Sequence, residues 1–204
     1  MTDATRTPQP VPGAGELLRQ ARVDLLAGRV PQAEAKLHRV IAANPHGPDA
    51  HRFLGRARAR QGDPLGALGA FQRAIALGGK SAGLFNDLGI ALGAIGKHQP
   101  AAAAYRLAIQ MNPGTPGLYM NLANAQTAAG DAAGAASTWA ECAQACPADP
   151  VARHMVAAQR GAAAPERAND DFVAATFDGF AATFDETLDR LGYRAPALVA
   201  DALA

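Results

Sequence analysis

The chain has 204 residues and a formal net charge of +1, with 18% charged and 49% hydrophobic residues. This near-neutral balance argues against a general nucleic-acid binder. No apolar run reaches the roughly 18 residues that a membrane-spanning helix needs. Residues 1–13 are rich in Thr, Pro and Gly and lack the basic end and apolar run of a secretory signal. We expect a disordered leader and a cytoplasmic protein with no nucleic-acid or membrane partner.

Four stretches that follow the leader share a period of 34 residues. A set of glycines, a set of alanines and a set of bulky residues all keep this step: Gly28, Gly62, Gly96 and Gly130; Ala33, Ala67, Ala101 and Ala135; Leu37, Phe71, Tyr105 and Trp139. A fixed period of this kind indicates one supersecondary unit that is copied and stacked. We predict two short helices in each copy, with the glycine in the turn between them and the alanines buried.

The third copy shows the pattern most fully, with Leu88-Gly89 on its first helix, Ala101 and Tyr105 on its second, and Pro113 at its end. This pattern and its length resemble the tetratricopeptide repeat. The resemblance implies an all-α solenoid of four helix–turn–helix repeats over residues 14–147. The first repeat departs most, because Gln20-Ala21 replaces the Leu-Gly pair. In this family extended peptides usually bind along the first helices, so a protein- or peptide-binding scaffold is implied.

Prolines stand where several helices are expected to begin, as at Pro64, Pro116 and Pro150, because the first turn of a helix does not need their missing N–H group. Asp63, Thr115 and Asp149 precede these prolines and are predicted N-caps. The stretch from Pro150 to Arg160 has the phase of another first helix, and Gly161–Pro165 then breaks the pattern. We expect a capping half repeat over 148–164.

The first helices should also supply the ligand-binding groove. Side chains opposite the Leu-Gly position are expected to face it: Arg22, Arg52, Arg56, Asn86, Ile90, Met120, Asn121 and Asn124. Asn can bond both the N–H and the C=O of a peptide backbone, and Arg can hold a carboxylate by two parallel bonds. Arg52 and Arg56 lie one turn apart, so the expected ligand carries an acidic group. The alternative interpretation is that these residues form ordinary solvated helix faces.

Few residues are candidates for catalysis, metal binding or disulfide formation. Cys142 and Cys146 lie four apart on one predicted helix, and Cys142 takes the place of a repeat alanine, so a buried reduced thiol is expected. A metal would need further ligands with suitable spacing, and the histidines are scattered over the repeats. We expect no catalytic residue, no metal and no cofactor in this chain.

The end of the chain differs in charge and in aromatic content. Residues 1–164 hold 16 Lys/Arg against 10 Asp/Glu, a net charge of +6, whereas residues 165–204 hold 3 against 8, a net charge of −5. Phe177, Phe180 and Phe184 follow a helical spacing. Since soluble monomers rarely expose such an apolar face, we expect this helical tail to dock on the repeats or to form a homodimer with a second tail.

The tail carries a second resemblance. Phe177-Asp178, Ala181, Phe184-Asp185 and the block from Leu191 to Pro196 resemble the segment that joins tetratricopeptide repeats to a class I methyltransferase domain in a bacterial family. The resemblance implies S-adenosylmethionine for the parent protein only, because this chain lacks a strand with a Gly-rich turn. The chain would then be a truncated or naturally split protein.

These observations leave three functions open. The first is the substrate-recruiting or assembly region of such a methyltransferase, in which the chain itself does not catalyse methyl transfer. The second is a stand-alone adaptor or co-chaperone, with no enzyme attached. The third is a catalytic fragment that is completed by another chain.

Overall fold

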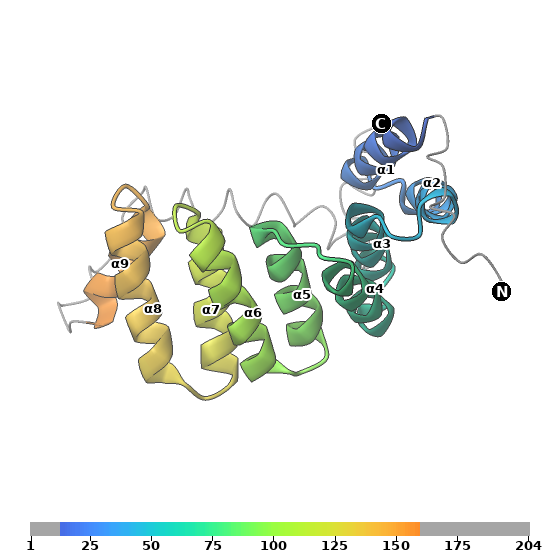
Figure 1. The fold of residues 1–204 in the computed structure, drawn as a ribbon. Helices are drawn as coiled ribbons and strands as arrows, with labels where there is room; N and C mark the ends of the chain where they lie inside the picture. Colours follow the sequence, from blue (N-terminus) through green and yellow to red (C-terminus); the bar gives the residue numbers. More distant parts are fainter. Residues whose placement is uncertain (1–12, 160–204) are drawn as a thin grey trace, which may run out of the picture. The chain divides into compact units, whose positions relative to one another are not determined.

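The computed structural model describes residues 13–159, and all regular structure in that range is helical. The helices are coloured in chain order in Figure 1: α1 Ala14–Leu26, α2 Val30–Ala43, α3 Pro48–Arg60, α4 Pro64–Ala76, α5 Ala82–Ala94, α6 His98–Met111, α7 Pro116–Ala128, α8 Ala132–Ala145 and α9 Pro150–Gln159. The chain divides between Glu141 and Cys142 into two units, and α1 to α7 belong to the first. The predicted leader up to residue 12 and the predicted tail, including its phenylalanine stripe, lie outside the described residues.

Helices in the first unit pack in the order in which they follow one another. The pairs α1–α2, α3–α4 and α5–α6 pack within repeats, and each second helix also contacts the first helix of the next repeat. The first helices α1, α3, α5 and α7 contact one another in succession. The predicted all-α fold of stacked helix–turn–helix repeats is therefore confirmed.

The repeated glycine ends the turn inside each unit. Gly28, Gly62, Gly96 and Gly130 have φ values of 69°, 78°, 75° and 81°. A residue with a Cβ atom is disfavoured in this left-handed region, whereas glycine adopts it without steric cost. The conformation explains why this position keeps its glycine in all four copies.

Small residues at the other repeated positions let the helices approach closely. Ala33, Ala67 and Ala101 are fully buried. A Cβ atom on Gly89 would lie 2.5 Å from the Tyr105 ring, and one on Gly55 would lie 2.4 Å from the ring of the equivalent Phe71. The same aromatic residues also share apolar clusters with the first helix of the next repeat, through Leu84 for Phe71 and Leu122 for Tyr105. Trp139 and Ala135 are buried as predicted.

The N-cap residues of the helices agree in part with those predicted from the sequence. Asp63 accepts the Gly66 N–H at 2.8 Å, and Asp149 accepts the Ala152 N–H at 2.7 Å, so both predicted N-caps are confirmed. Thr115 occupies the predicted N-cap position of α7, but its hydroxyl makes no capping bond and only its carbonyl accepts, from the Leu118 N–H. Ser81 and Asp131 cap α5 and α8 in the same way as Asp63.

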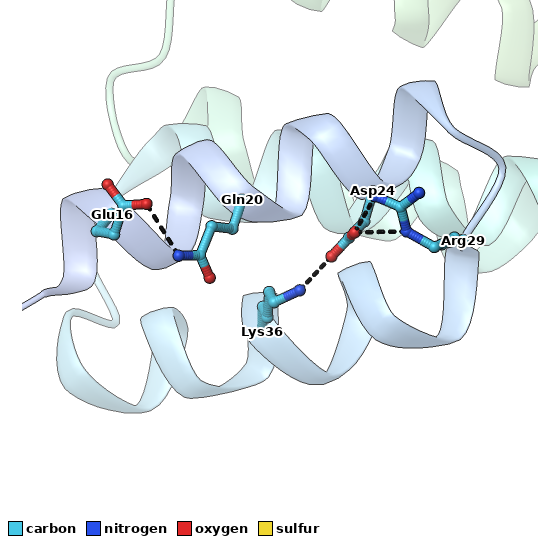
Figure 2. A network of polar contacts seen from close by, with 5 residues as sticks. All are labelled: Glu16, Gln20, Asp24, Arg29 and Lys36. Carbon is cyan, nitrogen blue, oxygen red and sulfur yellow. Dashed lines mark hydrogen bonds and ion pairs between the residues drawn. The ribbon is translucent and has the colours of Figure 1, made fainter.

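Besides its apolar cluster, the first repeat contains a polar network that joins α1 to α2 (Figure 2). Asp24 is 5% exposed and accepts the Arg29 Nε–H at 2.9 Å. Its other carboxylate oxygen accepts from Lys36 of α2. The two bonds to the Lys36 and Arg29 side chains hold the pKa of Asp24 below its ordinary value. This carboxylate thus joins the end of α1 to the next turn and to the middle of α2.

One side of α1 is polar where later first helices are apolar. Glu16 is exposed and accepts from Gln20 at 2.9 Å (Figure 2). The equivalent positions in the next repeats hold Ala50, Leu84 and Leu118, which are buried. No described helix packs on this side of α1, where Glu16 and Gln20 are exposed, and polar residues are suited to such a position.

The second unit is described only over its first residues. Cys142 is buried, Cys146 is half-buried, and neither forms a disulfide, so the predicted buried thiol is confirmed. Burial raises the pKa of the Cys142 thiol to about 12. None of the helices described is long and apolar enough to cross a membrane.

Two glycines of α5 should respond to alanine in opposite ways. Gly89→Ala should lower the free energy of unfolding, because the new methyl group meets the Tyr105 ring and overpacking costs about 1–3 kcal/mol. Gly93→Ala should raise it by up to about 1 kcal/mol, since that Cβ meets no atom within 4 Å and alanine favours helix. Urea denaturation of both variants measures the two effects. Equal midpoints for the two variants would refute the packing described here.

The Asp24 network predicts a pH-dependent contribution to stability. Because the folded-state pKa of Asp24 is lowered, its contribution is complete above the unfolded value of about 3.9 and is lost as the pH falls toward the folded value. Asp24→Asn should therefore be less stable than wild type at pH 7, and the difference should shrink below about pH 4. Urea denaturation at both pH values measures this, with the exposed Asp49→Asn as control. A difference that does not change with pH would contradict it.

Candidate functional site

One side of the four first helices in the first unit forms a candidate surface, which is at least partly exposed except at the buried Phe53. Three positions of each helix recur along it with the sequence period, and we call these twelve residues the first-helix face: Leu18, Arg19 and Arg22 of α1; Arg52, Phe53 and Arg56 of α3; Asn86, Asp87 and Ile90 of α5; Met120, Asn121 and Asn124 of α7. Within each helix the three side chains lie on one side, because residues four apart are neighbours on a helix. All eight residues predicted to line a groove belong to this face.

A groove of about 340 Å³ opens between α1 and α3 on this face. Its lining is largely cationic and consists of Leu18, Arg19, Arg22, Asp49, Arg52, Phe53 and Arg56. The guanidinium carbons of Arg22 and Arg52 each lie 5.6 Å from the centre of the Phe53 ring. Such cation–π contacts hold the arginine planes against the ring. The predicted Arg22, Arg52 and Arg56 are therefore brought together.

Arg52 has a carboxylate partner inside the protein. Its Nε–H donates to Asp87 of α5 at 2.9 Å, and the two side chains are only 20% and 13% exposed. The guanidinium also lies against the backbone of α5, where a Cβ on Gly83 would be 2.2 Å from Nη2. Burial raises the pKa of Asp87, and the Arg52 and Arg56 guanidinium groups oppose that shift. Arg52 thus joins α3 to α5 and is less accessible than its sequence suggests.

The face is neutral over α5 and α7, apart from Asp87. Asn121 Nδ2 donates to Asn86 Oδ1 at 2.9 Å, which joins these two helices. Ile90 and Met120 are 47% and 44% exposed, and Asn124 is also exposed. Apolar side chains of this size are available for contact with another molecule.

Sequence reasoning missed Asp87 and Phe53, which decide where the arginines lie. Asp87 lies one period and Phe53 two periods before Asn121, which was predicted to line the groove, since Arg19, Phe53, Asp87 and Asn121 are equivalent positions. A comparison of these four positions would have found them. Whether a ligand binds this face stays a prediction.

Elsewhere in residues 13–159, no three His, Cys, Asp or Glu side chains gather in a way that could hold a metal ion. Another groove, of about 470 Å³, lies beside the Asp24 network of the first repeat. Its buried carboxylate already has two basic partners, so it offers less unpaired charge than the groove between α1 and α3.

Comparison with known structures supports the fold. PilF of Pseudomonas aeruginosa is 18% identical and aligns over 90% of this chain and 93% of its own, with a TM-score of 0.68. YrrB, described as a TPR protein with an unusual peptide-binding site, is 15% identical over 91% of this chain and 90% of its own, with a TM-score of 0.60. The first TPR of Spaghetti (RPAP3), bound to the HSP90 peptide SRMEEVD, is 19% identical over 57% of this chain and 93% of its own, with a TM-score of 0.55. Identities this low show the fold alone.

The family itself is shown by a match along the sequence. No curated protein matches this chain. The tetratricopeptide-repeat family matches residues 18–82 and 86–150, which together cover more than half of the sequence. These matches coincide with the helix pairs from α1 to α8. The chain therefore belongs to the tetratricopeptide-repeat family.

Proposed function

We propose that this chain binds a segment of a partner protein along the first-helix face, and that the segment places a carboxylate in the groove between α1 and α3. A binding scaffold is supported by the family and by two similar structures, RPAP3 with its bound HSP90 peptide and YrrB with its peptide-binding site. The peptide bound to RPAP3 is itself acidic near its end, as its sequence SRMEEVD shows. The cationic lining of the groove supports the same class of ligand here.

The single observation that carries this proposal is that two arginines in the groove have no carboxylate partner among residues 13–159. Within the described part of the chain, Arg52 pairs with Asp87 and Arg19 pairs with Glu16, but neither Arg22 nor Arg56 forms an ion pair. Both are on the first-helix face, one on each side of the groove. Two guanidinium groups that line one groove and form no ion pair among the described residues favour an anionic group, since arginine binds carboxylates through parallel hydrogen bonds.

The test begins with a ligand that is chosen without bias. Peptides selected from a random display library by the whole chain would be measured against wild type and against the Arg22→Glu/Arg56→Glu double variant. The variant should bind at least about tenfold more weakly, because a hydrogen bond to a charged group contributes roughly 1.5–3 kcal/mol. Arg106→Glu, at an exposed position of α6, is the matched control and should bind as wild type does.

Salt provides a second readout in the same experiment. Affinity should fall between low and high ionic strength, because exposed charges are screened over a Debye length of about 10 Å at 0.1 M salt. Arg52 is left unchanged in the double variant, since its replacement would also break the contact with Asp87. Unchanged affinity after both arginines are reversed would move the site away from this groove.

We further propose that the chain serves a SAM-dependent methyltransferase as its substrate-recruiting or assembly region. The support is the sequence block from Phe177 to Pro196, which lies outside the described residues. The stand-alone adaptor is the alternative, and the acidic ligand proposed above is compatible with both. A homodimer through the tail and a cytoplasmic location stay proposals that rest on the sequence alone.

The methyltransferase proposal predicts how this chain responds to the cofactor. Residues 1–204 should not bind S-adenosylmethionine, because the sequence has no strand with a Gly-rich turn for it. Calorimetric titration of the chain with S-adenosylmethionine measures this. A stoichiometric binding curve would contradict the recruiting role and would favour a catalytic fragment.

A further inference from the structure

Charge is distributed unevenly over the first helices. Helix α3 carries four arginines and one acidic residue, Asp49, whereas the only charged residue of α5 is Asp87 and α7 has none. The first-helix face is therefore cationic over α1 and α3 and lacks positive charge over α5 and α7. Asp87 stands where the two halves meet.

Asp87 acts on both halves of the face. It accepts the Arg52 Nε–H at 2.9 Å, so the charge of this arginine is already paired within the protein. Its own carboxylate is 13% exposed and lies within reach of the Arg56 charge. Arg52 offsets the charge of this carboxylate, and neither α5 nor α7 supplies a further cation. A ligand carboxylate placed over α5 would therefore lie beside Asp87 without gaining an ion pair of its own, which is unfavourable at an interface.

The half beyond Asp87 offers a different kind of contact. Ile90 and Met120 are large apolar side chains that are nearly half exposed. Covering them with apolar ligand atoms would be favourable in proportion to the area removed from water. This half therefore favours apolar side chains where the other half favours acidic ones.

We infer that Asp87 determines the specificity of the face, so that it accepts protein segments whose acidic residues and apolar residues are separated into two blocks. The acidic block lies over Arg22 and Arg56, and the apolar block lies over Ile90 and Met120. This inference rests on the proposed function, since it concerns the same face. It goes further by assigning a role to Asp87 and an order to the ligand.

The distance from α1 to α7 determines how long a test peptide must be to cover the face. Packed helices lie about 8–10 Å apart, so the three junctions from α1 to α7 span about 30 Å. An extended chain rises about 3.3 Å per residue, and a peptide of about nine residues therefore covers the face. Peptides with equal shares of Asp, Leu and Ser can be arranged either in blocks, in both chain directions, or with the three residue types interleaved.

The experiment compares these arrangements at constant composition by fluorescence anisotropy with the whole chain. Peptides in blocks, in one of the two directions, should bind at least about tenfold more tightly than interleaved peptides, because discrimination arises from unfavourable contacts with the wrong ligand. Asp87→Asn should bring this ratio close to one by improving the binding of interleaved peptides. Asp87→Glu, which keeps the charge, should preserve the ratio.

Asp49→Asn is the matched control, because Asp49 is an exposed carboxylate in the lining of the cationic groove itself. Its loss should tighten the binding of all acidic peptides and leave the ratio unchanged. Each of three results would overturn the inference: equal or absent binding of both arrangements to wild type, an unchanged ratio in Asp87→Asn, or the same loss of ratio in Asp49→Asn. The proposed function would still hold after any of these results if library-selected peptides bind the Arg22→Glu/Arg56→Glu variant more weakly than wild type.

Discussion

The contact between successive first helices is the constraint on which the candidate surface depends. At two junctions, side chains 35 residues apart meet directly, as Arg52 with Asp87 and Asn86 with Asn121. At the junction before them, Leu18 packs against the apolar cluster that contains Phe53. Because the sequence period is one residue shorter than this separation, each junction joins two adjacent positions of the repeat. Because the period is kept through several copies, equivalent pairs of positions meet at each junction and the contacts form one continuous row.

The three junctions differ in chemistry, and this difference gives the face its properties. The first is apolar, the second is ionic and the third is an amide pair. At the ionic junction Arg52 is paired with Asp87, whereas Arg22 and Arg56, which line the same groove, form no ion pair among the described residues. A scaffold with four similar backbones therefore presents a surface that changes along its length. Such variation is how repeat proteins with one fold can bind different ligands.

The sequence predicted the backbone well because the relevant positions repeat. The glycine of each turn and the buried Ala67 and Ala101 follow from steric limits that are the same in every copy. It predicted the polar details less well. The missing side-chain bond of the N-cap residue Thr115 and the pairing of Arg52 each depend on the conformation of one side chain in one copy, which a period does not fix. The tail, with its phenylalanine stripe, lies outside the described residues.

The central claim is that Arg22 and Arg56 meet the ligand while Arg52 stays bound to Asp87. NMR spectra that resolve the arginine Nε–H groups test this claim directly, when a library-selected acidic peptide is titrated into the whole chain. The Arg22 and Arg56 signals should shift with added peptide, and the Arg52 signal should be protected from exchange and change little. A shift at Arg52, with Arg22 and Arg56 unaffected, would contradict the account.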